Sequence, residues 1–406
     1  MNFPFFLAKR ITFVGQRTFS KLIVRVTIGA LTLAIIAIIL SVAILNGFKG
    51  GITDKQRGFF GDVIVTKYDL NSSYENTPLA LDSTEINEIK QLPNVVNLYP
   101  FATKAGIMNV NGEVEGVLLK GIDKDYDQEY LSKTLLEGDT IDFIHDEDAE
   151  NKILLSSYLC NRLHLKVGDE FLMYFIQEPI RKRKFKIQGV YSTNSDELDK
   201  IYVIGSLNLI RRLNNLGPNE AGGYEIRINN FALLDSTTRL VDETLPLELT
   251  ATNVVEQLPD IFNWLNMLDM NDNIIFALMV IVAVINMISA LLISILERSA
   301  MIGVLKALGM ANKGIKKIFL YNSLYLIGYG LVLGNGIALA IYLFQRSTRF
   351  FKLDPSIYYI EYVPMFIHWY DVVLLNGALI VIALLTMFIP SMLISRISPI
   401  KTLQFK

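Results

Sequence analysis

The sequence predicts an α-helical membrane protein with four transmembrane helices and a large α+β domain outside the membrane. Of its 406 residues, 51% are apolar and only 19% are charged, which excludes a disordered or fibrous chain. Four stretches contain no Asp, Glu, Lys or Arg over a length that can cross a hydrocarbon core, which needs about 20 helical residues. These stretches are Val26–Asn46, Asn273–Leu296, Ile318–Gln345 and Val372–Ser395.

The first stretch is predicted to remain in the protein as a transmembrane helix. A cleaved signal peptide has an apolar run of roughly 7–15 residues, and this run is longer. Its small-residue sequence Ser41-Val42-Ala43 lies inside the apolar run, whereas a cleavage site would follow it. We therefore interpret residues 26–46 as an uncleaved span.

The charges between the spans predict which side of the membrane each piece occupies. Segments 1–25, 297–317 and 396–406 together carry 13 basic residues and 1 acidic residue, whereas 47–272 and 346–371 carry 25 basic and 39 acidic residues. Short basic segments stay in the cytoplasm, while a long domain crosses the membrane largely regardless of its charge. Both termini are thus predicted to be cytoplasmic, with a large outside domain and a second, shorter outside loop.

The two flanks of the outside domain are predicted to build one subdomain together. Both show the same order of a β-rich run, a helical run and a second β-rich run, bounded by Gly, Asn and Pro. The first helix has Asp82 or Ser83 as its N-cap. The first set covers Asp62–Thr66, Thr84–Gln91 and Val95–Pro100, and the second covers Tyr224–Asn229, Leu233–Thr244 and Leu247–Thr252.

The middle of the outside domain is predicted to be an inserted second subdomain with two hairpins. Asn111-Gly112 is a strong type I′ turn signal between two β-rich runs. A second hairpin is expected between Phe171–Ile176 and Phe185–Tyr191. Beyond Thr252 the pattern becomes helical from Pro259, and if it runs unbroken into the second span, about a dozen residues project roughly 18 Å from the membrane. That helix is a candidate lever.

Two charged clusters of the outside domain invite a functional interpretation. The acidic run from Asp142 to Glu150 lacks the D-x-[DN]-x-[DN]-G spacing of a calcium loop, so we interpret it as a solvated loop. The basic run Arg181-Lys182-Arg183-Lys184 is expected at the tip of the second hairpin. It is either a charged edge that resists aggregation or a docking patch for an acidic partner.

The sequence offers little of the chemistry that an enzyme or an ion-driven transporter needs. With one cysteine, Cys160, and three histidines, it has no internal disulfide and too few ligands for a zinc cluster. The spans hold no Asp, Glu, Lys or Arg, no H-E-x-x-H and no G-x-S-x-G motif, and so no catalytic residue is assigned. Gly309 and Gly314 have phosphate-loop spacing, but Ile315 stands where that loop needs Lys. Any energy must therefore come from a partner.

The segment between spans two and three carries the most specific pattern. It reads ERSAMIGVLKALG from Glu297 to Gly309, which predicts a short amphipathic helix on the cytoplasmic side. Either this helix lies flat on lipid, or its glycines allow close contact with another surface. In span three, Gly330, Gly334 and Ala338 form a small-residue stripe that is predicted to pack against a neighbouring helix. The apolar face of the short helix is predicted to consist of Met301, Val304, Leu305 and Leu308.

This segment resembles the cytoplasmic signature E-x-x-x-x-I-G-x-L-K-A-x-G of the FtsX-like permeases, the membrane subunits of MacB-type ABC transporters. Within that superfamily it is most similar to the lipoprotein-releasing Lol permeases. The resemblance covers essentially the whole chain and implies the MacB-type (type VII) permease fold, with a Porter and Sabre pair as the periplasmic domain. Its other supporting residues are Asn46-Gly47-Phe48, Tyr358-Tyr359-Ile360, Pro390 and Ser398-Pro399-Ile400-Lys401-Thr402-Leu403.

The resemblance implies three sets of functional residues. One couples to a cytoplasmic ATPase, one lines a cavity for lipoprotein acyl chains, and one docks a periplasmic carrier through a loop that maps onto Gln177–Lys184 and is short here. The cavity residues are equally consistent with plain lipid contact or helix packing. The coupling set is Glu297, Arg298, Gly303, Lys306, Ala307 and Gly309; the cavity set is Leu45, Phe48, Met267, Met270 and Ile274; the docking set is Arg181, Lys182, Arg183 and Lys184.

The implied function is that of a non-catalytic permease subunit in a bacterial inner membrane, which releases lipoproteins by mechanotransmission. The chain itself is expected to hold no cofactor, with ATP and Mg bound by the partner ATPase. Expected partners are an ABC ATPase dimer, a second permease copy or paralogue, lipoprotein cargo, a periplasmic carrier and membrane lipid, but no nucleic acid. The alternatives are a transmembrane relay that activates a cell-wall hydrolase, an efflux component and, from another class, an intramembrane hydrolase.

Overall fold

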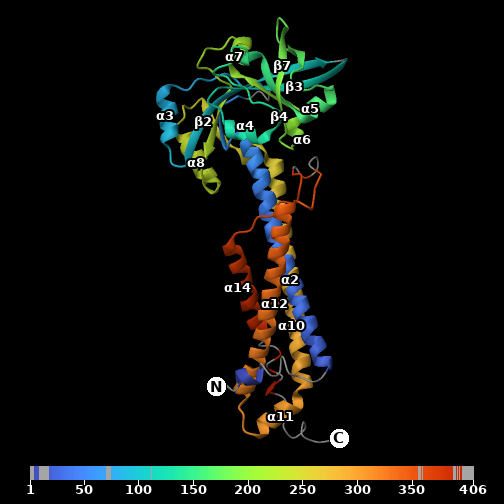
Figure 1. Cartoon of the computed structure of the whole chain (residues 1–406). Helices are drawn as coiled ribbons and strands as arrows, with labels where there is room; N and C mark the ends of the chain where they lie inside the picture. Colours follow the sequence, from blue (N-terminus) through green and yellow to red (C-terminus); the bar gives the residue numbers. More distant parts are fainter. Residues whose placement is uncertain are drawn as a thin grey trace. The chain divides into compact units, whose positions relative to one another are not determined.

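The chain forms two compact units. A computed structural model describes residues 4–8, 18–69, 75–110, 112–354, 358, 360–386, 390, 392 and 394–395 (Figure 1). Asn111, Tyr359, residues 1–3 and 9–17 of the N-terminal segment and the whole C-terminal segment 396–406, which includes the 398–403 motif, lie outside these described residues. The first unit comprises Met1–Gly50, Trp264–Lys352 and Tyr362–Lys406, and the second comprises Gly51–Asn263 and Leu353–Glu361.

The first unit is a bundle of helices. Four described helices are long and apolar enough to cross a membrane. The 39-residue helix from Pro259 to Glu297 has no break, which confirms the continuous helix predicted beyond Thr252; its proline occupies the first helical position, where no N–H is needed. The four are α2 (Thr18–Phe60), α10 (Pro259–Glu297), α12 (Asn312–Thr348) and α14 (Trp369–Thr386), and the short α11 (Ser299–Ala307) joins α10 to α12.

The small-residue stripe of α12 packs against α2, as predicted. A Cβ atom added at Gly334 would lie 2.8 Å from the Cβ of Ile35, and one at Gly330 would lie 2.9 Å from the Cβ of Leu31. Ala338 is fully buried in the same contact. Since no side chain separates the helices at these glycines, the two backbones approach closely.

The second unit contains one ten-stranded sheet. Its order is β10-β1-β9-β2-β3-β8-β5-β7-β4, and β6 pairs with both β2 and β7. Strands β2, β3, β8, β5, β7 and β6 therefore close into a ring. The strands are β1 (Val63–Lys67), β2 (Val95–Val110), β3 (Glu113–Ile122), β4 (Leu135–Gly138), β5 (Lys152–Ser156), β6 (Glu170–Phe175), β7 (Arg181–Tyr191), β8 (Tyr202–Ser206), β9 (Gly223–Ile228) and β10 (Leu249–Asn253).

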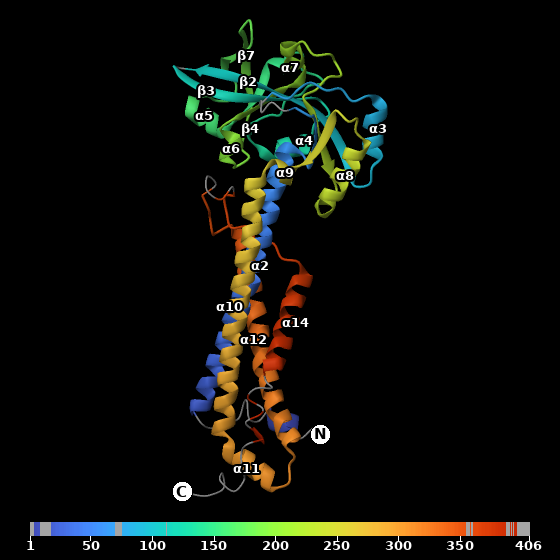
Figure 2. The same ribbon diagram turned by 180° about the vertical axis from the view of Figure 1, so that it is seen from behind.

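The two flanks of this unit pair with each other, which confirms the predicted shared subdomain. Strand β1 from the first flank lies between β9 and β10 of the second, and the first half of β2 pairs with β9. Helices α3 (Ser83–Gln91) and α8 (Leu234–Thr244) lie side by side against this part of the sheet (Figures 1 and 2). Asp82 caps α3 in a capping box with Glu85, as its position predicted.

The strand ring forms the predicted inserted subdomain and encloses its apolar core. Met108, Leu119, Ile153 and Phe175 are among its fully buried side chains. Val110 pairs directly with Glu113, so the first predicted hairpin has the two-residue turn that its sequence indicated. The remaining short helices are α4 (Gln128–Thr134), η1 (Ala149–Asn151), α5 (Ser157–Leu163), α6 (Asp196–Asp199), α7 (Leu207–Asn214), η2 (Phe231–Leu233) and α9 (Val254–Gln257).

Candidate functional site

The six residues of the predicted coupling set lie on or beside α11. Glu297 ends α10, and Arg298 is the N-cap position of α11. Gly309 has φ +87°, a left-handed conformation that favours glycine and lets the chain turn toward α12. Ile302 is fully buried in one cluster with residues of α10 and α12 and with Ile394. The segment is therefore a folded elbow between two long helices.

The predicted apolar face of α11 is only partly covered within this chain. Met301 and Leu305 pack against buried clusters, whereas Val304 and Leu308 are 45% and 79% exposed. Ile302, which was not assigned to the apolar face, is a fully buried residue of this helix. As a result the outward face of α11 is apolar and consists of Ala300, Val304, Ala307 and Leu308.

Lys306 ties α11 to the last described residues of the chain. Its Nζ donates a 2.7 Å hydrogen bond to the carbonyl oxygen of Ile394. A hydrogen bond from a charged donor contributes roughly 1.5–3 kcal/mol when it is shielded from water. Because Ile394 also packs against Ile302, the elbow and this part of the chain form one contact.

Polar side chains join α2 and α10, which lie side by side in both views (Figures 1 and 2). Ser41 Oγ donates to Asp272 Oδ1 at 2.5 Å, and Lys49 Nζ lies 2.5 Å from Asp269 Oδ2. We call these two contacts the α2–α10 seam. Sequence reasoning did not single out these residues, because their partners are more than 200 positions away.

The predicted cavity residues do not form one wall within a single chain. On α10, Met267, Met270 and Ile274 are 59%, 65% and 55% exposed. At 100° per residue they lie roughly 160° around the helix from Asp269 and Asp272, which face α2. On α2, Leu45 and Phe48 are half-buried. The α10 residues therefore face away from the helix that was predicted to share the cavity with them.

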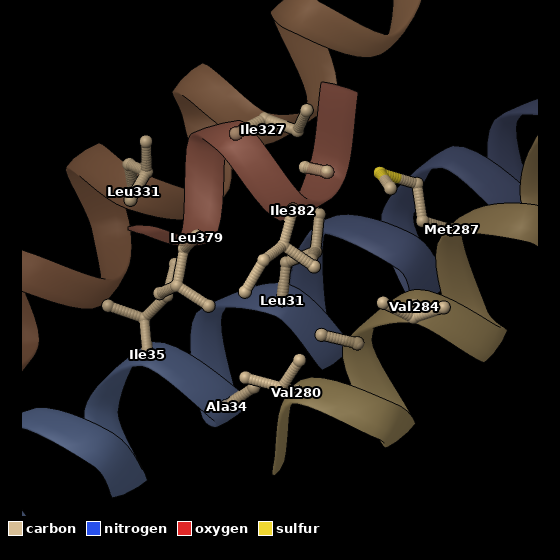
Figure 3. A pocket seen from close by; sticks show the side chains of 12 residues that line it. Leu31, Ala34, Ile35, Val280, Val284, Met287, Ile327, Leu331, Leu379 and Ile382 are labelled. Atoms are coloured by element: carbon tan, nitrogen blue, oxygen red, sulfur yellow. The ribbon is translucent and has the colours of Figure 1, made fainter. Parts of the chain in front are cut away.

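An apolar cavity in the helix bundle was considered as a cargo site. It lies among α2, α10, α12 and α14, and side chains such as Leu31, Val284, Met287 and Leu379 surround it (Figure 3). Its volume is about 30 Å³. A cavity that admits benzene has roughly 150 Å³. This space is a packing void, and it is too small for an acyl chain.

The basic run lies on a strand and not at a hairpin tip. Arg181–Lys184 form the first residues of β7, and Phe175 pairs with Arg181. The prediction was wrong because pairing begins at the first arginine, which leaves only residues 176–180 for the turn. In the turn, Ile176 and Ile180 are exposed. Lys184 forms an ion pair with Glu170 on the neighbouring strand.

The acidic run does not gather into a metal site. The Asp142 carboxylate accepts hydrogen bonds from the backbone N–H groups of Ile144 and His145, and Asp146 forms an ion pair with Lys152. No group of three His, Cys, Asp or Glu side chains among the described residues is placed to hold a metal ion. The interpretation as a solvated loop fits these contacts.

Sequence reasoning missed a buried ion pair in the second unit. Lys120 Nζ on β3 lies 2.6 Å from Glu225 Oε1 on β9, and the two side chains are 3% and 1% exposed. The only sequence signal was one lysine and one glutamate within strands whose other residues are largely apolar. Nothing in a single sequence pairs two residues 105 positions apart.

Two protein-family models match the chain. The MacB-like periplasmic core domain matches residues 26–241, more than half of the chain, and the FtsX-like permease C-terminal model matches residues 273–399. The chain belongs to the FtsX-like, MacB-type permease family. The permease carries its signature segment, 297–309, within the second match.

Curated relatives match the permease along its whole length. The lipoprotein-releasing system transmembrane protein LolE of Haemophilus influenzae is 20% identical, over 99% of both chains. LolC of Neisseria meningitidis serogroup B is 22% identical, over 96% of this chain and 95% of its own. The permease is thus similar to lipoprotein-releasing proteins throughout.

Solved structures match the second unit at low identity. The periplasmic region of MacB from Actinobacillus actinomycetemcomitans is 15% identical, covers 51% of this chain and 95% of that one, and gives a TM-score of 0.34. The extracellular domain of the transporter YknZ from Gram-positive bacteria is also 15% identical, covers 47% of this chain and 99% of that one, and gives a TM-score of 0.32.

The family assigns the permease its general role. It is an ABC transporter permease with four transmembrane helices and a MacB-like periplasmic domain, as the sequence predicted. It is a multi-pass protein of the inner membrane. Membership also implies an ATPase partner and a permease partner, because the family's members are subunits of ATP-driven complexes.

Proposed function

We propose that the permease uses ATP hydrolysis by a partner subunit to release lipoproteins from the inner membrane to a periplasmic carrier. Full-length similarity to LolE and LolC supports this cargo. Removing acyl chains from a bilayer costs about 0.8 kcal/mol per buried CH₂ group. A lipoprotein with several long chains therefore does not leave spontaneously, and ATP and Mg²⁺ bound by the partner would supply the energy.

The observation that carries the mechanism is the continuity of α10. One 39-residue helix begins in the second unit and ends at the α11 elbow. A helix of that length without a proline or glycine break is stiff. In the proposal, both termini and α11 are cytoplasmic, nucleotide binding moves α11, and α10 transmits the movement toward the periplasmic domain.

The outward face of α11 is the proposed ATPase contact. Its apolar side chains are exposed although the segment is flanked by charged residues, and exposed apolar patches mark interaction sites. Leu308 on this face is 79% exposed. The predicted coupling set then divides into residues that shape the elbow, such as Gly309 and Lys306, and residues that the partner touches, such as Ala307.

The proposed acyl-chain cavity needs a second permease chain. Met267, Met270 and Ile274 face away from α2 of their own chain, so the opposite wall must come from a copy or a paralogue. Methionine suits this role because its flexible side chain adapts to chains of different length. The exposed basic residues of β7 are the proposed docking surface for the carrier, together with the apolar hairpin turn beside them.

The test is release from reconstituted vesicles that contain the permease, its ATPase, a triacylated lipoprotein and the soluble carrier. We expect transfer of the lipoprotein to the carrier only with hydrolysable ATP. Leu308→Asn should weaken ATPase binding by about tenfold or more, as an interface anchor would. Ile176→Asn, which changes another exposed apolar residue in the other unit, should leave ATPase binding unchanged.

The cellular counterpart of this test is depletion. Normal delivery of lipoproteins to the outer membrane in depleted cells, with the other envelope functions impaired, would reject lipoprotein release. A co-purifying cell-wall hydrolase would then point to the signal-relay alternative, and a periplasmic adaptor would point to efflux.

A further inference from the structure

The last turn of α2 belongs to the second unit, and the buried Lys120 and the largely buried Arg227 bind its carbonyl groups. The final carbonyls of a helix lack partners within the helix and must find them elsewhere. The Phe59 carbonyl accepts a hydrogen bond from Lys120 Nζ on β3. The Gly58 carbonyl accepts one from Arg227 Nη2 on β9 at 2.5 Å. Two different strands thus hold the same helix end.

Carboxylates and aromatic rings hold these cations in place. Glu225 pairs with Lys120 at 2.6 Å and accepts a 3.2 Å hydrogen bond from the Tyr126 hydroxyl. Lys120 Nζ also lies 4.5 Å from the centre of the Phe59 ring. Burial lowers the pKa of Lys120, and the charge of Glu225 opposes that shift. We call Lys120, Glu225 and Arg227, with the carbonyls of Gly58 and Phe59, the α2 joint.

Stability alone does not explain a buried pair of this kind. A well-packed apolar pair often stabilises a protein as much as a buried ion pair, because desolvation offsets the attraction of the charges. The charges instead fix how the end of α2 is placed on the sheet. Cations at a helix C-terminus interact favourably with the helix dipole, and their hydrogen bonds fix the helix end at defined positions on the sheet.

A neighbouring cavity of about 330 Å³ offers an alternative use for the pair. Lys120 and Glu225 line it together with residues of β1, β2, β8 and β10. However, its polar side chains bond to one another: Thr103 Oγ1 donates to Asn76 Oδ1 at 2.9 Å, and Gln257 Nε2 donates to Thr252 Oγ1 at 3.0 Å. The donors of Lys120 are directed at Phe59, Tyr126 and Glu225. The contacts therefore favour the helix end over a ligand.

We propose that Lys120 and Arg227 are positioning residues that make the end of α2 and the periplasmic sheet one rigid body. Helix α2 runs unbroken for 43 residues, from the membrane unit to Phe60 in the second unit. Through the joint, any rotation or shift of this helix reaches β3 and β9. The proposal rests on the proposed function, since it concerns how movement in the membrane reaches the domain that meets the carrier.

The test compares two pairs of substitutions in the complete permease–ATPase complex. Lys120→Met with Glu225→Gln removes the joint's ion pair without leaving an isolated buried charge. Lys104→Met with Glu75→Gln is the control, because this 2.9 Å pair joins Lys104 on neighbouring β2, almost as buried as Lys120, to Glu75 outside the sheet. We expect the joint variant to keep ATP turnover but to release about tenfold less lipoprotein per ATP, a typical coupling effect. The control variant should match the wild type in ATP turnover and in lipoprotein released per ATP.

A distance measurement separates positioning from a merely structural role and does not depend on cargo. Spin labels at the exposed Leu247 of two permease copies should report a nucleotide-dependent distance change in the wild-type complex, and labels at the exposed Leu278 on α10 should report the membrane helices. The joint variant should lose the change at Leu247 and keep the change at Leu278. If the wild type releases no lipoprotein, the proposed function fails, while this comparison still tests the joint.

Two results would overturn the proposal. One is a joint variant with a normal thermal unfolding temperature and an unchanged distance response at Leu247. If the double variant does not fold, Arg227→Gln replaces it, because that change removes the bond to the Gly58 carbonyl and leaves the Lys120 pair intact. A folded Arg227→Gln complex with wild-type release per ATP and wild-type distances is the other contradicting result.

Discussion

Replacing Gly334 by alanine tests the close packing of α2 and α12. The added Cβ would lie 2.8 Å from both Cβ and Cγ2 of Ile35 and 3.3 Å from the carbonyl oxygen of Thr32. Carbon atoms prefer separations of about 3.5–4.0 Å, so the helices must move apart by roughly 1 Å or side chains must leave their rotamers. Overpacking of this kind costs about 1–3 kcal/mol.

Gly336→Ala is the matched control on the same helix. A Cβ there meets no atom within 4 Å. Both substitutions gain the same helix propensity, about 1 kcal/mol for Gly to Ala, so this term cancels in their comparison. The free energy of unfolding of Gly334→Ala should therefore be lower than that of Gly336→Ala by about 1–3 kcal/mol.

The assay is reversible unfolding of both purified variants in one detergent, followed by tryptophan fluorescence. Gly330→Ala, whose Cβ would lie 2.9 Å from the Cβ of Leu31, should behave like Gly334→Ala. Equal stability of the Gly334 and Gly336 variants would show that α2 and α12 are not packed at this glycine. In that case the small-residue stripe would have another role.

Three further predictions concern separate parts of the chain. Burial raises the pKa of the Cys160 thiol to about 12 from an ordinary 9.0, so the thiol stays protonated at pH 8. Maleimide should therefore label the folded protein about 1,000-fold more slowly than it labels an exposed cysteine, because the thiolate is the reactive form. The labelling rate should rise about tenfold per pH unit up to pH 11. Labelling at the ordinary rate would contradict this burial. Asp82→Ala removes the capping box of α3 and should lower the free energy of unfolding by about 1 kcal/mol, whereas the exposed Glu88→Ala on the same helix should not. Asn335 and Asn376 exchange 3.0 Å hydrogen bonds between α12 and α14. Each single change to leucine should therefore lower the free energy of unfolding by about 1 kcal/mol. A double variant whose loss of free energy equals the sum of the two single losses would disprove the pairing.

The sequence predicted those features that depend on local pattern. Uncharged stretches located the four membrane helices because hydrocarbon excludes charge over the whole length of a span. The cap at Asp82 and the turn between Val110 and Glu113 depend on residues within four positions of each other. The stripe from Gly330 to Ala338 also depends only on residues close in sequence, since small residues four apart leave one helix face open.

The features that the sequence did not predict depend on distant partners. The buried face of α11 is set by residues of α10 and α12 and by Ile394, so the amphipathic pattern of the short helix alone did not indicate that Ile302 is the residue buried within the chain. The position of Arg181 depends on where pairing with β6 begins, and a one-residue difference moves a side chain from turn to strand. The Lys120–Glu225 pair joins strands 105 positions apart.

The α2–α10 seam connects the two proposed mechanical elements. Lys49 and Ser41 bind Asp269 and Asp272 within the first unit, two contacts about two helical turns apart along α2. Two helices that are joined at two points resist sliding past each other, because any shift breaks both polar contacts. Movement that enters α10 from the α11 elbow would therefore also reach α2. The hydrogen bonds of the α2 joint to β3 and β9 would then offer a second route for the proposed movement to reach the periplasmic domain.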